Sequence, residues 1–323
     1  MKKYILKRLL LIIPVLIGIT IITFSIIHLT PGGFTVVNMQ MNTKISPDSI
    51  MRLKALYGLD KPIPVQYFDW FGRFIRFDFG VSFIDNRPVI DKILERLPAT
   101  ILLNFCALVV IFVFGILIGV LSAVKRNTAF DKTMTILTFI GYSVPAFWLA
   151  LLLMLVFGVQ LKIFPIAGIV SMNFDSMNFT EKIFDIAWHL ILPVFITAFG
   201  SLAYISRYMK SSMIEVLSQY YIKAAYAKGM PEKTIIYKSA LKNSLLPVIT
   251  LLGLSLPGLI GGSFIFETIF AWPGMGRLAY ESAITFDYPV IMGVATIAAF
   301  LTLLGNLIAD ITYAAIDPRI RYK

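Results

Sequence analysis

The sequence has few of the side chains that catalysis, metal binding and redox chemistry use. Among its 323 residues there is one cysteine, Cys106, and there are two histidines, His28 and His189, which lie in different apolar runs. A single cysteine excludes a disulfide within the chain, and such a residue usually serves as a small apolar side chain. Two histidines so far apart favour a structural role for each. We therefore expect no catalytic residue, no metal site and no cofactor.

The short motifs that mark nucleotide binding and hydrolysis are also missing. The sequence contains no GxxxxGK[ST] loop, no HExxH, no CxxC and no GxSxG. The glycine-rich run from Pro273 to Arg277 lacks the Lys-Ser/Thr pair of a phosphate-binding loop. An intramembrane enzyme is disfavoured, because neither a nucleophile–base pair nor an acid dyad is evident. If the chain moves a solute uphill, a partner must supply the energy.

Charge is scarce as well. Charged residues make up 15% of the chain, hydrophobic residues make up 58%, and the mean hydropathy is +0.82. Soluble domains carry about a quarter charged residues, so the composition indicates a polytopic membrane protein. The net charge of +11 is then expected to gather on cytoplasmic loops and near anionic lipid headgroups, and it does not indicate nucleic-acid binding.

Six uncharged runs are long enough to cross a membrane. A spanning helix needs about 20 apolar residues, and helices keep every backbone hydrogen bond within the segment. The first run follows a basic start, is too long for a signal-peptide core and ends without a cleavage site, so we expect it to remain. The predicted spans are Leu9–Thr30, Pro98–Val124, Thr133–Leu161, Ile186–Ser206, Asn243–Phe266 and Tyr288–Ala309.

The distribution of Lys and Arg predicts that both termini are cytoplasmic. We expect three parts: an N-terminal tail with the first transmembrane helix at 1–30, an extracytoplasmic segment with interfacial helices at 31–97, and a core of five transmembrane helices at 98–323 with a cytoplasmic loop at about 207–242. The 31–97 segment is rich in aromatic residues between positions 67 and 79. These are typical of an amphipathic helix at the headgroups, and an outer docking or gating element remains an alternative.

The stretch from Tyr220 to Pro247 is the one long basic run between apolar segments. It holds five lysines and a single acid, Glu232. Helical spacing covers Ile214–Ala227, Gly229 interrupts it, and Pro231 followed by Glu232 is typical of a helix start. The sequence therefore predicts two short helices joined at Gly229, an elbow that a partner protein would move.

Polar residues inside the predicted spans are few. We expect Asn104 and Ser143, together with the large side chain of Trp148, to line a translocation pathway. The spans hold no row of acids or histidines such as a secondary carrier or ion-driven transporter usually needs. Gly115 and Gly119 form a GxxxG pair, which marks either a close helix contact or nothing more than two small residues in an apolar run.

The run Lys223-Ala224-Ala225-x-x-x-Gly229, followed by Leu246-Pro247, resembles the EAA loop of ABC importer permeases. Over nearly its whole length, and in the same order, the chain is similar to the first permease component of dipeptide, oligopeptide and nickel importers. Two of the segments that carry this similarity are RLPATILL and FETIFAWPGMGRLAYESAITFDYP. Lys223 stands where the signature has its leading glutamate, and the distance from Gly229 to Pro247 exceeds the general consensus. Both departures bear on the coupling contacts.

The resemblance implies an all-α protein of the type I importer permease fold in a bacterial or archaeal cytoplasmic membrane. The implied partners are a second permease subunit, one or two ATP-binding cassette subunits that hydrolyse ATP, an extracytoplasmic substrate-binding protein, and membrane lipid. Di- or oligopeptides are the expected substrate, with nickel and oligosaccharides as alternatives and a stand-alone secondary carrier as the alternative class. The implied contacts with the ATPase are Ala224, Ala225, Lys228 and Gly229, and those with the binding protein are Glu267, Trp272, Arg277, Glu281 and Asp287.

Overall fold

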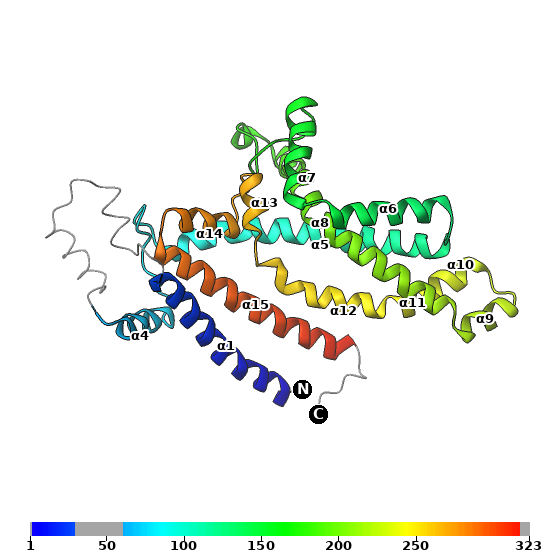
Figure 1. Cartoon of the computed structure of the whole chain (residues 1–323), viewed down its shortest axis with the longest axis horizontal. Helices are drawn as coiled ribbons and strands as arrows, with labels where there is room; N and C mark the ends of the chain where they lie inside the picture. Colours follow the sequence, from blue (N-terminus) through cyan, green and yellow to red (C-terminus); the bar gives the residue numbers. More distant parts are fainter. Residues whose placement is uncertain (1, 30–60, 317–323) are drawn as a thin grey trace.

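The computed structural model describes residues 2–29 and 61–316. Within these ranges the chain is helical, apart from loops and one isolated bridge between Val81 and Pro88. Four long helices dominate the architecture (Figure 1): α1 (Lys2–Leu29), α5 (Val89–Val124), α8 (Phe179–Leu217) and α15 (Tyr288–Ile316). The predicted all-α class therefore holds for the described residues, and part of the predicted 31–97 segment lies outside them.

Four helices are long and apolar enough to cross a membrane, and two bent helix pairs raise this to six if each pair is one span. One bent pair is α6 (Ala129–Ser143) with α7 (Ala146–Leu153) and a π-helical turn to Gln160, and the bend is 104°. The third predicted span is thus not one straight helix. Val144 is extended before Pro145, because a proline disfavours the helical conformation in the residue before it.

Helices α5 and α8 are longer than the predicted spans. With 36 and 39 residues they measure about 54 and 58 Å, against about 30 Å for the hydrocarbon core. Helix α5 begins at Val89, nine residues before the predicted boundary, because Pro98 is accommodated inside the helix. Helix α8 begins with a capping box, in which Asn178 and Glu181 each accept a backbone N–H of the other. Both helices therefore project beyond the apolar layer.

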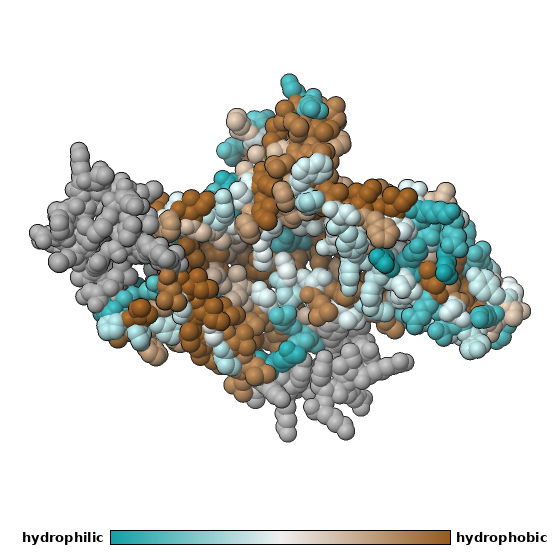
Figure 2. All heavy atoms as spheres, in the orientation of Figure 1, coloured by the Kyte–Doolittle hydropathy of each residue, from teal (hydrophilic) through white to brown (hydrophobic). Residues whose placement is uncertain are grey.

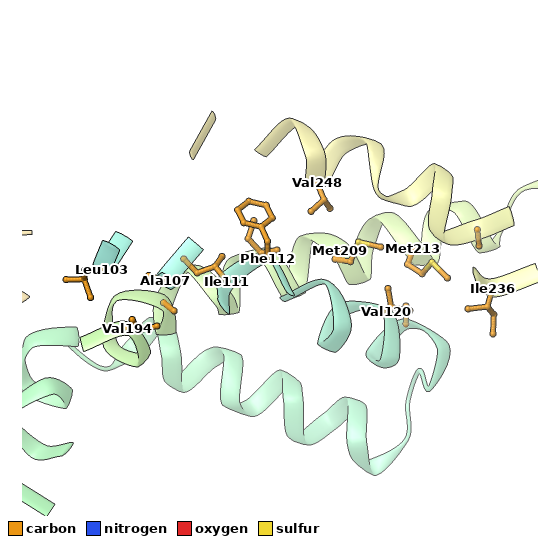
Figure 3. Close-up of a cluster of buried hydrophobic side chains, with 14 of the residues drawn as sticks. Leu103, Ala107, Ile111, Phe112, Val120, Val194, Met209, Met213, Ile236 and Val248 are labelled. Carbon is orange, nitrogen blue, oxygen red and sulfur yellow. The ribbon is translucent and has the colours of Figure 1, made fainter. Parts of the chain in front are cut away.

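The core lies where α5 packs along α8. Figure 3 shows side chains from both helices, among them Leu103, Ile111, Val194 and Met209, in one buried cluster. The two glycines of the GxxxG pair lie at this contact: an added Cβ on Gly119 would lie 2.6 Å from the carbonyl oxygen of Ser206, and one on Gly115 would lie 2.8 Å from Ile205. The pair therefore marks a real close approach of two helix backbones.

The remaining elements attach to this pair. Helix α1 runs beside α15, with an ion pair between Arg8 and Asp310 at 3.0 Å. Helix α4 (Ile63–Phe74) packs against α1. Tyr67 of α4 hydrogen-bonds to Thr20 of α1 at 3.0 Å, and Gln66 hydrogen-bonds to His28 at 3.1 Å. Figure 1 places α4 at one end of the molecule and the helices α9 (Tyr220–Ala227) and α10 (Glu232–Thr234) at the other.

We predict that Gly119→Ala destabilises the fold. The new methyl group would overlap the backbone of α8 and force the two helices apart, at a cost of about 1–3 kcal/mol. The melting temperature of the purified protein in detergent should fall. Gly18→Ala in α1 is the matched control, because nothing lies within 4 Å of an added Cβ there, and equal melting temperatures for both variants would contradict the close approach.

Candidate functional site

The predicted elbow is formed by α9 (Tyr220–Ala227), α10 (Glu232–Thr234), a π-helical turn (Ile235–Ala240) and α11 (Leu241–Ser244). The expected helix Ile214–Ala227 is wrong in one respect, since α8 ends at Leu217 and α9 starts separately at Tyr220. The break at Gly229 is confirmed. Gly229 has φ +70°, a left-handed conformation that costs glycine little.

Two backbone hydrogen bonds end α9 at Gly229. The N–H of Gly229 donates to the carbonyl of Tyr226 at 2.9 Å, and the N–H of Met230 donates to that of Ala225 at 3.2 Å. This pair is a Schellman motif, which satisfies the last carbonyls of a helix. The chain therefore turns at Gly229, and α10 begins three residues later at Glu232.

The elbow has one face anchored in the core and one face open. Ile222 and Ile235 are fully buried in the same cluster as Met209 and Met213 of α8. Ala225 is half-buried against that cluster. Three of the four predicted coupling residues, Ala224, Lys228 and Gly229, are exposed. The structure thus separates Ala225, which packs inward, from the residues that a partner would meet.

Aromatic side chains surround the open face. Tyr220 is 87% exposed and Tyr237 is 56% exposed, and both lie on the elbow beside lysines. The ammonium group of Lys223 lies 5.5 Å from the ring centre of Tyr220. Figure 2 shows that the end of the molecule carrying α9 and α10 is mostly hydrophilic. Tyrosine is enriched at protein interfaces.

A cavity of about 550 Å³ lies among α5, α6, α8 and α12 (Leu246–Ser255) with the 3₁₀ turn that follows it. Asn104 lines it, as predicted, and its side-chain amide donates to the carbonyl of Leu259 at 3.0 Å. Ser143 and Trp148 are exposed and are not among the lining residues. The other polar lining residues, which the sequence did not single out for the pathway, bear hydroxyl groups: Tyr142, Thr197, Ser201, Tyr204 and Ser255. The rest of the lining is apolar or glycine.

The predicted docking residues separate into a buried group and a half-exposed one. Glu267 and Trp272 are fully buried and Asp287 is 1% exposed, so their side chains make no outward contact in this structure. Arg277 and Glu281 are half-exposed and form an ion pair at 2.7 Å on α14 (Met275–Ile284). Only these two present charge to a partner.

Glu267, on α13 (Phe264–Ile269), joins the segment 262–277 to α5. Its carboxylate accepts the hydroxyl of Thr100 at 3.0 Å and the backbone N–H of Arg277 at 2.9 Å. Trp272 donates its indole N–H to the carbonyl of Ala99 at 2.9 Å. An added Cβ on Gly274 would lie 2.4 Å from the carboxylate, so glycine is what lets the chain wrap this closely. We assign Glu267 a structural role.

Asp287 makes a second connection of the same kind. Its carboxylate accepts the hydroxyl of Ser82 and the backbone N–H of Phe83, and Lys92 lies 3.9 Å away. Burial opposes ionisation of the neighbouring Asp85, but hydrogen bonds from Lys92, Ser82 and Arg87 lower the pKa of Asp85 to about 2. The segment before α5 is therefore fixed to the start of α15. Neither Ser82 nor Lys92 carries a sequence signal that would have revealed this contact.

Comparison with known proteins identifies the family. Residues 115–322 match the family described as binding-protein-dependent transport system inner membrane component, and residues 1–104 match its N-terminal counterpart. The chain belongs to this family. It is therefore a membrane component of a transport system, and it is not a catalytic enzyme. The resemblance stated from the sequence is confirmed.

Curated relatives of this permease family match end to end. The oligopeptide transport system permease protein AppB of Bacillus subtilis (strain 168) is 43% identical over 323 residues, with both chains fully covered. The dipeptide transport system permease protein DppB of Escherichia coli (strain K12) is 38% identical over 339 residues, also with full coverage of both. A putative peptide permease of Brucella suis is 38% identical over 322 residues, 99% of each chain.

We predict that the Glu267 network makes stability depend on pH. Burial raises the pKa of the Glu267 carboxyl, against the opposing hydrogen bonds from Arg277, Thr100 and Gly276. The pKa of Glu267 in the folded protein therefore lies above the value of about 4.3 for an unfolded chain. The contribution of Glu267 to the free energy of unfolding is complete below about pH 4.3, and it is lost as the pH rises through the folded-state pKa. The melting temperature should fall over this range.

Glu267→Gln should flatten that pH dependence. The substitution should also lower the free energy of unfolding by about 1–3 kcal/mol. The side-chain NH₂ of the new glutamine would face backbone N–H groups that donate to the Glu267 carboxyl group in the unchanged protein. Glu95→Gln is the control: Glu95 is exposed and its hydrogen bond from Arg87 lowers its pKa. This variant should keep the fall above pH 4.3. A pH profile of Glu267→Gln identical to that of the unchanged protein would refute the assignment.

Proposed function

We propose that the chain is the first permease subunit of an ATP-driven importer of di- or oligopeptides. The names of its relatives support the substrate class, since both AppB and DppB are named for peptide transport systems. In this proposal six spans cross a bacterial or archaeal cytoplasmic membrane, and both termini face the cytoplasm. The bent pairs α6–α7 and α11–α12 would each count as one span.

The observation that carries the proposal is the anchored elbow. Its open face offers Ala224, Lys228 and Gly229, while its inner face is fixed by Ile222 and Ile235 to the core beside α8. Small residues at a sharp turn would let a groove on an ATPase subunit approach the backbone closely. Lysines on the same surface would meet acidic side chains at the rim of that groove.

Motion of the elbow would reach the cavity through packed side chains. The cluster that holds Ile222 and Ile235 also holds Val248 of α12 and Ile111 of α5, and Ile111 lines the cavity. Packed interiors transmit displacement because they have little free volume. When ATP draws the ATPase subunits together, the elbow would move α8 and α12 against α5 and change access to the cavity.

The test of the proposal is peptide uptake into liposomes that contain the complete complex. Radiolabelled short peptides should accumulate only when ATP and the loaded binding protein are both present. Uptake driven by an ion gradient without the binding protein would favour a secondary carrier instead. ATPase activity stimulated by a binding protein loaded with another solute, without peptide uptake, would retain the importer and overturn the peptide assignment.

We predict that Gly229→Val uncouples the permease from its ATPase. A β-branched residue in the left-handed conformation costs about 1–2 kcal/mol, which corresponds to about tenfold weaker binding if the ATPase requires the elbow in this form. Affinity of the ATPase subunit and peptide uptake should both fall, while membrane insertion stays intact. Gly168→Val is the matched control, since Gly168 has φ +87° in a loop distant in sequence from the elbow. Equal uptake by the Gly229 variant and the unchanged protein would remove the coupling role.

A further inference from the structure

A second cavity, of about 320 Å³, is lined by α5, α6 and α8, three of the four helices that line the first. On α8, residues 197, 201 and 204 line the first cavity and residues 207, 211 and 214 line the second. Steps of three and four residues keep side chains on one face of a helix. Helix α5 lines the first cavity with residues between 104 and 111 and the second with residues 118 and 122. Helix α6 lines the first cavity with residue 142 and the second with residues 138 and 135. We call the set of helix faces that these lining residues share the hydroxyl track.

The hydroxyl track is neutral over most of its length. Its polar groups in the first cavity are the amide of Asn104 and five hydroxyls. The amide of Asn104 and the hydroxyls that line the first cavity can donate hydrogen bonds to a ligand and accept them from it. Two hydroxyl oxygens along the track, Thr197 Oγ1 and Ser122 Oγ, are buried without a hydrogen-bond partner among the described residues.

Positive charge enters the track in the second cavity. Of the two cations there, Lys210 is neutralised, because its ammonium group pairs with Asp131. Arg207 lies 5.8 Å from the ring centre of Phe139, and among the described residues no carboxylate lies within ion-pair distance of it. A guanidinium group keeps its charge in any environment and binds carboxylates with two parallel hydrogen bonds. Arg207 is the one unneutralised cation on the described track.

We propose that Arg207 binds the terminal carboxylate of a peptide in transit, while the hydroxyl track binds its backbone amides. This inference rests on the proposed function and assigns a substrate-binding residue within it. Every linear peptide with a free C-terminus carries this carboxylate, whatever its side chains are. A neutral track with a single cation would therefore accept peptides of many sequences and would discriminate against peptides whose C-terminus is blocked.

The test uses the complete complex in phosphatidylcholine nanodiscs and one photoreactive dipeptide in two forms, the free acid and the C-terminal amide. The diazirine-bearing dipeptide is added without binding protein, and mass spectrometry locates the cross-links. The free acid should label α6 and α8 about tenfold more than the amide, because only the acid makes a charge-assisted bond. Equal labelling by the two forms, or no label on α6 and α8, would overturn the proposal.

Variants assign the effect to one side chain. Arg207→Gln should reduce labelling by the acid to the level of the amide, and Arg207→Lys should retain part of the difference. Arg126→Gln removes the same charge from the exposed turn before α6 and should leave the difference unchanged. An undiminished preference for the acid in Arg207→Gln would overturn the assignment.

Two further arms separate this inference from its alternatives. If nanodiscs of phosphatidylglycerol abolish labelling that phosphatidylcholine permits, an anionic lipid is the ligand of Arg207 and the proposal fails. The uptake assay tests the proposed function independently. Uptake by the unchanged complex, together with unaltered labelling in Arg207→Gln, would overturn the role of Arg207 alone. No ATP-dependent peptide uptake would overturn the peptide importer, and with it the inference, whatever the labelling.

Discussion

The close approach of α5 and α8 is the contact on which the rest of the structure depends. In lipid, the hydrophobic effect gives little reason for two apolar helices to associate, so packing at short range must do it. Gly115 and Gly119 remove the side chains that would keep the backbones apart. The buried cluster, both cavities and the anchor of the elbow are all formed by these two helices and what packs on them.

Buried polar groups in this chain are of two kinds. On α13 and just before α15, the carboxyl groups of Glu267 and Asp287 accept hydrogen bonds from distant parts of the sequence. A buried carboxyl group bonded in this way holds segments in place, because breaking the contact leaves buried donors without an acceptor. Along the hydroxyl track, Thr197 Oγ1 and Ser122 Oγ are buried without a hydrogen-bond partner among the described residues. The first arrangement resists movement, whereas the second adds no such restraint.

The sequence predicted the features that depend on local chemistry. Hydropathy located the apolar segments, Gly229 and Pro231 located the elbow, and the whole-chain resemblance located the family. It did not predict features that depend on tertiary contacts. The 104° bend after α6 required knowing that α7 has a place to pack. The resemblance implied outward contacts for Glu267 and Asp287, but both are buried, and their donors Thr100 and Ser82 are more than 160 residues away in sequence.

The track also explains why pathway residues are hard to find from sequence alone. Asn104 stands out as an amide in an apolar run, but Tyr142, Tyr204 and Ser201 look like ordinary residues of membrane helices. Their common property is a shared face, which emerges only when α5, α6 and α8 are set side by side at the register fixed by Gly115 and Gly119. Charge is costly in hydrocarbon, and Arg207 is exposed at the end of this face. The helix contact that builds the core therefore also sets the face on which Arg207 lies.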